Sequence, residues 1–340
     1  MNSFGKIFRI SIFGESHGPS VGINIDGCPA GLALSVSDFD SDIERRKGGI
    51  QKGTTSRKED DIPVFLSGIF NGKTTGAPLT IIFENNNIRS VDYEKQRNTP
   101  RPGHADFVAG KKFNGFEDYR GGGHFSGRLT VCLVAAGVVA KKILALDQDQ
   151  NNTTNCYANI VEVGGEKDIE SAIKKAIDSN DSIGGIIECK VDGLPIGLGE
   201  PFFDSAESLL SHAVFAIPAI KGIEFGAGFA AATMKGSEHN DALENTGGKT
   251  LTNHAGGIVG GLTNGNQLVF RVVVKPTSST PKEQQTLNVE SGKIEKFSVK
   301  GRHDLCIALR VPVVLEAVTA CVLVDLLMRE QKNSRVIDNG

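Results

Sequence analysis

Alternation of apolar and polar residues predicts β-strands in several parts of the chain. Apolar side chains occupy every second position in Phe8 to Ile12 and in Val21 to Ile25, on either side of the loop FGESHGPS. The largely apolar segment from Leu268 to Val274 predicts another strand. A strand with one apolar face must pack that face against another layer of the protein.

Longer apolar segments predict helices at Arg128 to Leu146, Asp168 to Ser179, Asp204 to Ala216 and Val311 to Gln331. The first and last are apolar nearly all round, which is typical of buried helices. The apolar part of the first is too short to cross a bilayer, and the last carries Glu316 and Asp325, so we interpret both as core helices. Ala135, Ala136 and Gly137 would let a second helix approach closely.

Strands and helices follow one another without regular alternation, which favours an α+β fold over a doubly wound parallel sheet. No Rossmann fingerprint, internal repeat or convincing linker is present. We therefore expect one compact domain over residues 1–340.

Composition narrows the possible partners. The net charge is -3 and the sequence pI is about 6.2, so we expect neither nucleic acid nor a membrane surface as a partner. The first residues lack the features of a signal peptide, and a cytoplasmic location is expected. Six scattered cysteines without metal-binding spacing predict reduced thiols in the core; these are Cys28, Cys132, Cys156, Cys189, Cys306 and Cys321.

One basic cluster stands out against this acidic average. It contains Arg45, Arg46, Lys47, Lys52, Arg57 and Lys58, and three acidic residues follow it directly. On charge alone, a basic segment followed directly by an acidic one favours a solvated face.

The segment SGIFNGKTTG, residues 67–76, resembles a phosphate-binding P-loop only in part. Gly68 and Gly72 have three residues between them where that motif needs four. We therefore predict a hairpin turn at Asn71 and Gly72, between Val64 to Phe70 and Leu79 to Phe83.

Four loops place histidine beside glycine, usually with arginine or serine: GESHG, RPGHAD, RGGGHFSGR and GRHD. Glycine exposes backbone N–H groups, arginine binds anions and histidine exchanges protons near neutral pH, so together they predict a polyanionic small ligand and acid–base chemistry. We expect ordinary structural roles for His212 in a helix and His239 in a polar loop. Neither metal-ligand spacing nor a GxSxG elbow is present, so we predict no metal site and no serine hydrolase.

Several long motifs, in order over nearly the whole chain, resemble the chorismate synthase family. They are FGESHGPSVGINIDGCPAG, RPGHAD, YRGGGHFSGRLTVCLVAAGVVAKK, NHAGGIVGG, KPTSS and GRHDLCIALRVPVVLEA. The resemblance implies a homotetramer of β-α-β sandwich subunits. It also implies a lyase that eliminates phosphate from 5-enolpyruvylshikimate 3-phosphate in an anti-1,4 sense to give chorismate. That reaction requires reduced FMN without net redox change.

The resemblance assigns roles to individual residues. His17 corresponds to the proton donor for the departing phosphate, His104 to proton transfer with the reduced flavin, and Asp304 to the base that acts through the flavin N5. Arg46, Lys52 and Arg128 are expected to bind substrate anions, against the solvated-face interpretation of that cluster. The expected FMN-binding residues are His124, Phe125, Ser126, Ala219, Gly260, Lys275, Pro276, Thr277, Ser278, Ser279 and Arg302.

The chain departs from the family pattern at a few positions. His124 and Lys52 stand where many members have arginine, Pro218 stands where some have asparagine, and Leu305 stands where proline is common. Two alternatives stay open: a flavin-binding protein without lyase activity, and a bifunctional enzyme that reduces FMN itself. Because no dinucleotide fingerprint is present, we expect NADPH only as an indirect source of reducing equivalents.

Overall fold

The computed structural model describes residues 2–49, 51–55, 57, 59–87, 97–146, 153–299 and 303–332. One antiparallel sheet has the strand order β1 (Ser3–Phe4), β2 (Arg9–Gly14), β3 (Ser20–Asp26), β7 (Leu79–Glu84) and β4 (Val64–Ser67). A second has the order β10 (Ile220–Phe225), β13 (Leu268–Val274), β9 (Gly185–Asp192) and β8 (Asn155–Val163). Three small hairpins join β5 (Ile69–Phe70) to β6 (Lys73–Thr74), β11 (Ile258–Val259) to β12 (Leu262–Thr263), and β14 (Gln284–Leu287) to β15 (Ile294–Phe297).

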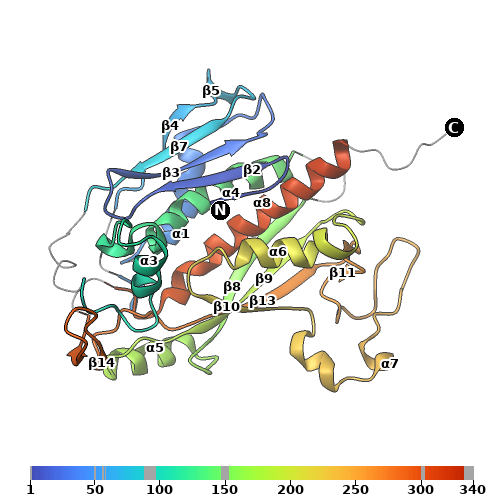
Figure 1. Ribbon diagram of the computed structural model, residues 1–340. Helices are drawn as coiled ribbons and strands as arrows, with labels where there is room; N and C mark the ends of the chain where they lie inside the picture. Colours follow the sequence, from blue (N-terminus) through green and yellow to red (C-terminus); the bar gives the residue numbers. More distant parts are fainter. Residues whose placement is uncertain are drawn as a thin grey trace.

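Two long helices, α4 (Thr130–Leu144) and α8 (Val311–Lys332), lie between the two sheets (Figure 1). Helix α4 contacts β3 and β7 of the first sheet, whereas α8 contacts β8 and β9 of the second. This confirms the α+β class and the β-α-β sandwich. The other α-helices of the described residues are α1 (Asp40–Arg46), α3 (Asp106–Lys112), α5 (Ile169–Asp178), α6 (Ala206–Val214) and the one-turn α7 (Gly236–His239).

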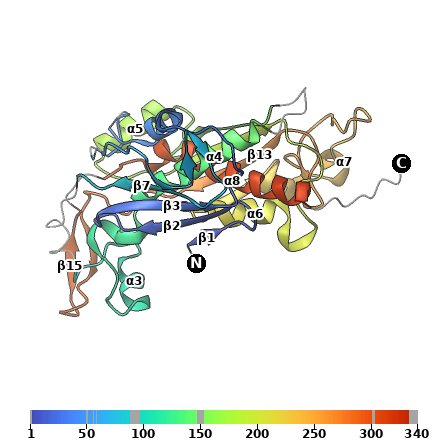
Figure 2. The ribbon, with the colours of Figure 1, turned by 90° about the horizontal axis from the view of Figure 1, so that it is seen from above.

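The alternating strands turn their apolar side chains toward these helices. Val21, Ile23 and Ile25 of β3 are fully buried, and Ile187 of β9 is buried in the same continuous core. Seen from above, α3 and β15 lie at one end of the molecule and α7 at the other (Figure 2).

Helices α4 and α8 pack with almost no space between their backbones. A Cβ atom on Gly137 would lie 2.2 Å from the Cβ of Ala317, which confirms the close approach predicted for this part of α4. Within the helical segment 307–330, 89% of an apolar 18-residue stretch is buried in the protein, so its composition reflects a core position between two sheets.

Two acidic residues of α8, Glu316 and Asp325, are buried and hydrogen-bonded. Asp325 accepts the backbone N–H groups of Lys6, Ile7 and Phe8 at 2.7 to 3.0 Å, which fixes the start of β2 on the helix. Glu316 accepts hydrogen bonds from Nη1 and Nη2 of Arg45, at 2.8 and 2.6 Å. Burying two carboxylates in an apolar helix is tolerable because each is paired in this way.

The predicted helices are confirmed, with ends set by local capping. Asp168 accepts the N–H of Ser171 at 3.1 Å, so α5 begins one residue later than predicted. The side chain of Ser205 caps α6 in the same way, which leaves Asp204 in a preceding 3₁₀ turn. His212 lies in α6 as expected, but the prediction of a polar loop for His239 was wrong, because this residue ends α7.

The hairpin at Asn71 and Gly72 is confirmed, and both residues have the positive φ angles of such turns, 47° and 72°. The prediction of a single strand from Val64 to Phe70 was wrong. Gly68 divides it, with a φ of 86° and a backbone so close to Leu79 that a Cβ would lie 2.6 Å from the Leu79 Cα. The six cysteines are free thiols, and five are fully buried.

Candidate active site

Loops that are far apart in the sequence surround a cavity of about 660 Å³. Its lining comes from the segments 46–61, 101–105, 121–130, 217–219, 275–279 and 303–311, with apolar residues from the surrounding helices and the first sheet. The N-terminal ends of α4 and α8 both reach this cavity. A neighbouring cavity of about 340 Å³ shares Arg101, His104, Ala105 and Phe125 with it.

The glycine-rich loop brings backbone directly against two histidines. Gly121, Gly122 and Gly123 all have positive φ, at 60°, 81° and 52°. A Cβ on Gly121 would lie 2.5 Å from the His17 ring, and one on Gly122 would lie 3.2 Å from the His104 ring. The loop therefore needs glycine both for its conformation and for these contacts.

His17 lies in the loop between β2 and β3 and is 5% exposed. Burial lowers its pKa below 6.5, and the positive charges of Arg57 and Arg120 lower it further. A proton on this ring is therefore held weakly as long as no anion lies beside it.

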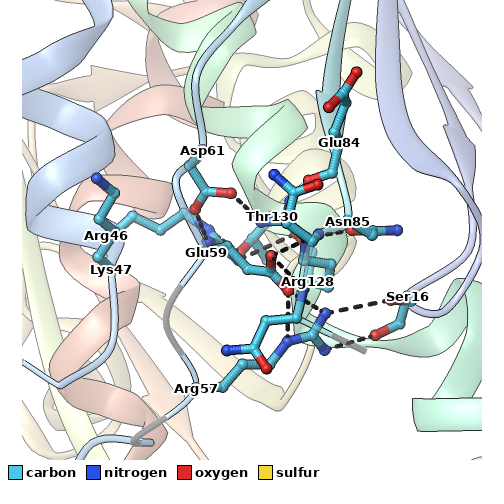
Figure 3. A network of polar contacts seen from close by, with 12 residues as sticks. Ser16, Arg46, Lys47, Arg57, Glu59, Asp61, Glu84, Asn85, Arg128 and Thr130 are labelled. Carbon is cyan, nitrogen blue, oxygen red and sulfur yellow. Dashed lines mark hydrogen bonds and ion pairs between the residues drawn. The ribbon is translucent and has the colours of Figure 1, made fainter. Parts of the chain in front are cut away.

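Arg57 connects this loop to the basic segment (Figure 3). Its guanidinium donates to the Ser16 hydroxyl at 3.2 Å and to Glu59 at 2.6 and 2.9 Å. The second Glu59 oxygen accepts the backbone N–H groups of Asn86 and Asn87. Arg57 is thus fixed within reach of the His17 loop.

A buried cluster of two arginines and one carboxylate lies beside it (Figure 3). Asp61 is paired with Arg46 at 3.2 Å and, through its other oxygen, with Arg128. Arg46 also donates to Thr130 and to two backbone carbonyls, and Arg128 donates to Asn85 and to the Glu84 carbonyl. One positive charge remains on this trio, and burial together with Arg310 lowers the pKa of Arg46.

The solvated-face interpretation was therefore wrong for Arg46, which is 3% exposed. Lys52 is exposed and does not line the cavity. The guanidinium groups of Arg46 and Arg128 border the cavity while their hydrogen bonds go to protein acceptors.

His104 follows a tight turn that begins at Arg101. Its Nδ1 lies 2.5 Å from Asp106 Oδ1 and 3.0 Å from Arg101 Nη2. Arg101 also donates to Ser279 at 3.0 Å, so this turn is tied to the segment after β13.

The residues after the three glycines line the same cavity. His124 Nδ1 lies 2.8 Å from the carbonyl of Gly14, which can only accept, so its proton is on Nδ1. Phe125 is 41% exposed, and the Ser126 hydroxyl accepts the N–H of Arg128 at 3.3 Å.

The segment from Lys275 to Ser279 forms the opposite wall. Lys275 Nζ donates to the Ser278 hydroxyl at 2.7 Å and to the Gly103 carbonyl at 3.2 Å; burial, together with the charge of Lys221, lowers its pKa. The Thr277 Oγ1 atom is buried and has no hydrogen-bond partner among the described residues. Ala219 has a φ of 74°, which is unusual for alanine, and its carbonyl accepts the Lys275 N–H at 2.9 Å.

Asp304 lies at the start of the C-terminal helical segment and is 9% exposed. Its carboxylate accepts the N–H of Thr55 at 2.9 Å and Nη1 of Arg310 at 2.8 Å. Arg302, its expected neighbour in the site, lies outside the described residues.

The cavity brings together most of the residues expected to bind FMN. These are His124, Phe125, Ser126, Ala219, Lys275, Thr277, Ser278 and Ser279, with His104 and Asp304 beside them. Pro276 is exposed behind its segment, and Gly260 lies in the exposed turn between β11 and β12, away from the cavity.

Sequence reasoning missed the roles of Arg57, Arg101, Asp106 and Arg310. Arg101 and Asp106 stand in the RPGHAD motif itself, so their spacing to His104 was an available signal. Arg57 and Arg310 gain their partners only through the fold.

Comparison with known proteins places the chain in one family. The family model for chorismate synthase matches residues 8–328. The chorismate synthase of Chitinophaga pinensis is 68% identical over 339 residues and all of both chains, and that of Dehalococcoides mccartyi is 43% identical over 99% of both. A crystal structure of a chorismate synthase, 24% identical, superposes with a TM-score of 0.72 and covers 96% of this chain and 93% of its own.

That family uses reduced FMN. Full-length matches, together with a cavity that gathers the family's motifs, leave one assignment. The chain belongs to the chorismate synthase family and is a carbon–oxygen lyase of the shikimate pathway, which serves aromatic amino acid biosynthesis.

Proposed function

We propose that this chain converts 5-enolpyruvylshikimate 3-phosphate to chorismate and inorganic phosphate by anti-1,4 elimination, with reduced FMN bound in the 660 Å³ cavity. The observation that carries the proposal is that His17 and His104 both lie against the same glycine loop, and that His104 and Asp304 line the same cavity. The substrate carries a phosphate and two carboxylates. The cavity wall matches this charge with Arg46, Arg128 and Arg310.

The cavity residues also fit FMN. The Thr277 hydroxyl is buried and has no partner among the described residues, so a ligand can satisfy it. Lys275 and Ser278 beside it suit a polar or anionic part of that ligand. The half-exposed Phe125 ring supplies an apolar surface for a flat ring system. Reduced FMN, when bound, supplies electrons that it regains by the end of each turnover. Gly260 and Arg302 stay in the proposal through the family resemblance alone.

The protein groups have separate tasks in this proposal. His17 donates its proton to the departing phosphate, and a phosphate beside the ring offsets the charges of Arg57 and Arg120. Asp304, held by Arg310 and Thr55, accepts the proton that the substrate loses. His104 exchanges a proton at the face of the cavity. Arg46 and Arg128 contribute positive charge toward the substrate anions, and Lys52, outside the cavity lining, stays in the proposal through the family resemblance alone.

A homotetramer in the cytoplasm completes the proposal. Phe202, Phe203 and Phe229 are 83 to 94% exposed, which suits surfaces that other subunits cover. Light scattering after gel filtration tests the assembly, and a monomer at micromolar concentration would contradict it.

The decisive experiment is anaerobic turnover of the substrate with dithionite-reduced FMN, with chorismate absorbance and phosphate release followed together. We expect equal amounts of both products, and none with oxidised FMN. Absence of both products from folded, flavin-binding protein would overturn the proposal. Oxidation of NADPH by protein and FMN alone would instead show a built-in flavin reductase and overturn the indirect role of NADPH.

A further inference from the structure

The Nδ1 atom of His104 has two neighbours of opposite hydrogen-bonding character. Asp106 Oδ1 lies 2.5 Å away and can only accept, whereas Arg101 Nη2 lies 3.0 Å away and can only donate. Only one of the two can bond to a given protonation state of Nδ1. The position of the His104 proton therefore depends on which neighbour prevails.

The surrounding contacts decide in favour of Asp106. Arg101 already donates Nε to Asp106 Oδ2 at 2.7 Å, Nη2 to Oδ1 at 2.8 Å and Nη1 to Ser279 at 3.0 Å, so it has acceptors other than the ring. Burial would raise the pKa of Asp106, but hydrogen bonds from Arg101 and His104 outweigh it and hold that pKa well below its usual range. An ionised carboxylate this close requires a proton on Nδ1.

We propose that Asp106 is a positioning residue that holds a proton on His104 Nδ1 and so reserves Nε2 for proton exchange in the cavity. The inference rests on the proposed role of His104. The Cε1 and Nε2 edge of the ring faces the glycine loop, where a Cβ on Gly122 would lie 3.2 and 3.4 Å from those atoms. The ring is thus clamped between a carboxylate and a backbone with no room for a side chain.

The arrangement also defines what removal of the carboxylate would do. With Asp106 neutralised, Arg101 Nη2 is placed to donate to Nδ1, which moves the ring proton to Nε2. Among the described residues, Arg101 and Asp106 contact His104, and Lys275 bonds to the carbonyl of the adjacent Gly103. A purely structural role would differ, because loss of the Arg101 ion pair would disturb the turn whatever residue stood at position 104.

A double-mutant cycle separates these two roles. We would measure kcat with reduced FMN for Asp106→Asn, His104→Gln and the double variant, with Asp204→Asn as a matched control that loses an arginine partner, Arg329, outside the cavity. We expect Asp106→Asn to lower kcat about 10- to 100-fold, at most the lower end of the contribution of a positioned acid or base, because His104 itself is retained. In the His104→Gln background the same change should alter kcat by no more than about twofold. Asp204→Asn should match the wild type.

Solid-state ¹⁵N NMR of histidine-labelled, flavin-free protein gives a readout independent of activity. The His104 signals, identified by their loss in His104→Gln, should report Nδ1–H in the wild type and Nε2–H in Asp106→Asn. If Asp106→Asn is too unstable to assay, Asp106→Glu tests the inference instead, because it keeps the carboxylate. We expect its kcat to be near that of the wild type.

The outcomes distinguish the inference from the proposed function. Wild-type kcat in His104→Gln would overturn the role of His104 and the inference with it. If His104→Gln lowers kcat, and Asp106→Asn lowers it by the full factor of about 10- to 100-fold in that background as well, the inference is overturned while the role of His104 stands. An unchanged tautomer in Asp106→Asn, or an Asp106→Glu variant as inactive as His104→Gln, would also overturn the inference.

Discussion

The guanidinium of Arg310 bridges Asp304 and the backbone of Arg46: its Nη1 donates to the carboxylate at 2.8 Å, and its Nε donates to the Arg46 carbonyl at 2.8 Å. A single side chain thereby fixes the proposed base relative to the buried arginine cluster. Thr55 holds the other carboxylate oxygen through its N–H. The orientation of Asp304 depends on both donors.

We predict that Arg310→Lys lowers kcat by about tenfold while flavin binding is retained. A lysine ammonium can replace one hydrogen bond, but it cannot reproduce the planar arrangement of two donors. Steady-state kinetics with reduced FMN, together with a flavin titration, would measure both effects. Arg329→Lys, which alters an ion pair away from the cavity, is the control. Equal kcat in the two variants would show that Arg310 does not position the base.

The lowered pKa of His17 predicts that kcat/KM and kcat lose activity at different alkaline pH values. As a proton donor His17 must be charged, so activity falls as pH rises through its pKa. In the free enzyme, burial and the charges of Arg57 and Arg120 hold that pKa below 6.5. The alkaline limb of the kcat/KM profile should therefore lie below pH 6.5. Bound phosphate raises the pKa, so the limb in kcat should lie at higher pH.

Arg57→Gln tests the cause of this shift. Removal of one of the lowering charges should move the alkaline limb of kcat/KM to higher pH, whatever it does to KM. Glu170→Gln, on the exposed side of α5, is a charge-change control and should leave the limb in place. A limb that does not move in Arg57→Gln would mean that His17 is not the group it reports.

Local patterns of apolar residues in the sequence predicted some strands of the fold and missed others. Strand β13 was predicted with its observed ends because Leu268 to Val274 is a short, valine-rich apolar segment interrupted only by Arg271. Strand β8 was missed because a bulge between Ile160 and Glu162 breaks its alternation. Strand β9 was missed although Ile187, Cys189 and Val191 alternate, since its opening glycine pair indicated a turn.

The site was predictable to the extent that its chemistry stays within short motifs. His104 and His17 stand out because glycine, serine or arginine adjoins them in the chain. The environment of His17 depends on Arg57, forty residues away, which no spacing rule connects to it. Likewise, Arg46 is buried because α1 packs against α4. This packing was not visible in the sequence, where a run of basic residues indicates a solvated face.

The contact between α4 and α8 predicts an unusual effect of alanine in a helix. Gly137→Ala would normally stabilise a helix by up to about 1 kcal/mol. Here the added methyl group would overlap Ala317, so we expect a net loss of about 1 to 3 kcal/mol, typical of an overpacked core. Chemical denaturation measures the change. Gly236→Ala in α7, where a Cβ meets nothing within 4 Å, is the matched control and should not destabilise.

Ala317→Gly should restore part of the stability lost in Gly137→Ala, because it removes the methyl group on the other side of the contact. If the double variant were less stable than Gly137→Ala by the full cost of glycine in a helix, the overlap would not be the cause.

The Thr277 hydroxyl has no partner among the described residues, so its removal can change ligand affinity without lowering the stability of the protein. Removal of a hydroxyl that has a partner costs about 0.5 to 1.5 kcal/mol of folding free energy, but this one has none to lose among the described residues. Thr277→Val should therefore leave the stability of the flavin-free protein unchanged or slightly increased. If the hydroxyl bonds to FMN, flavin affinity should fall by about tenfold, the equivalent of one hydrogen bond.

Thr233→Val is the matched control, because the Thr233 hydroxyl donates to the Ala230 carbonyl in an exposed turn outside the cavity. Flavin affinity should be unchanged in that variant. Fluorescence titration of FMN and thermal unfolding without flavin would measure the two quantities separately. Unchanged affinity in Thr277→Val, or an equal loss in both variants, would place FMN away from this hydroxyl and against the other walls of the cavity.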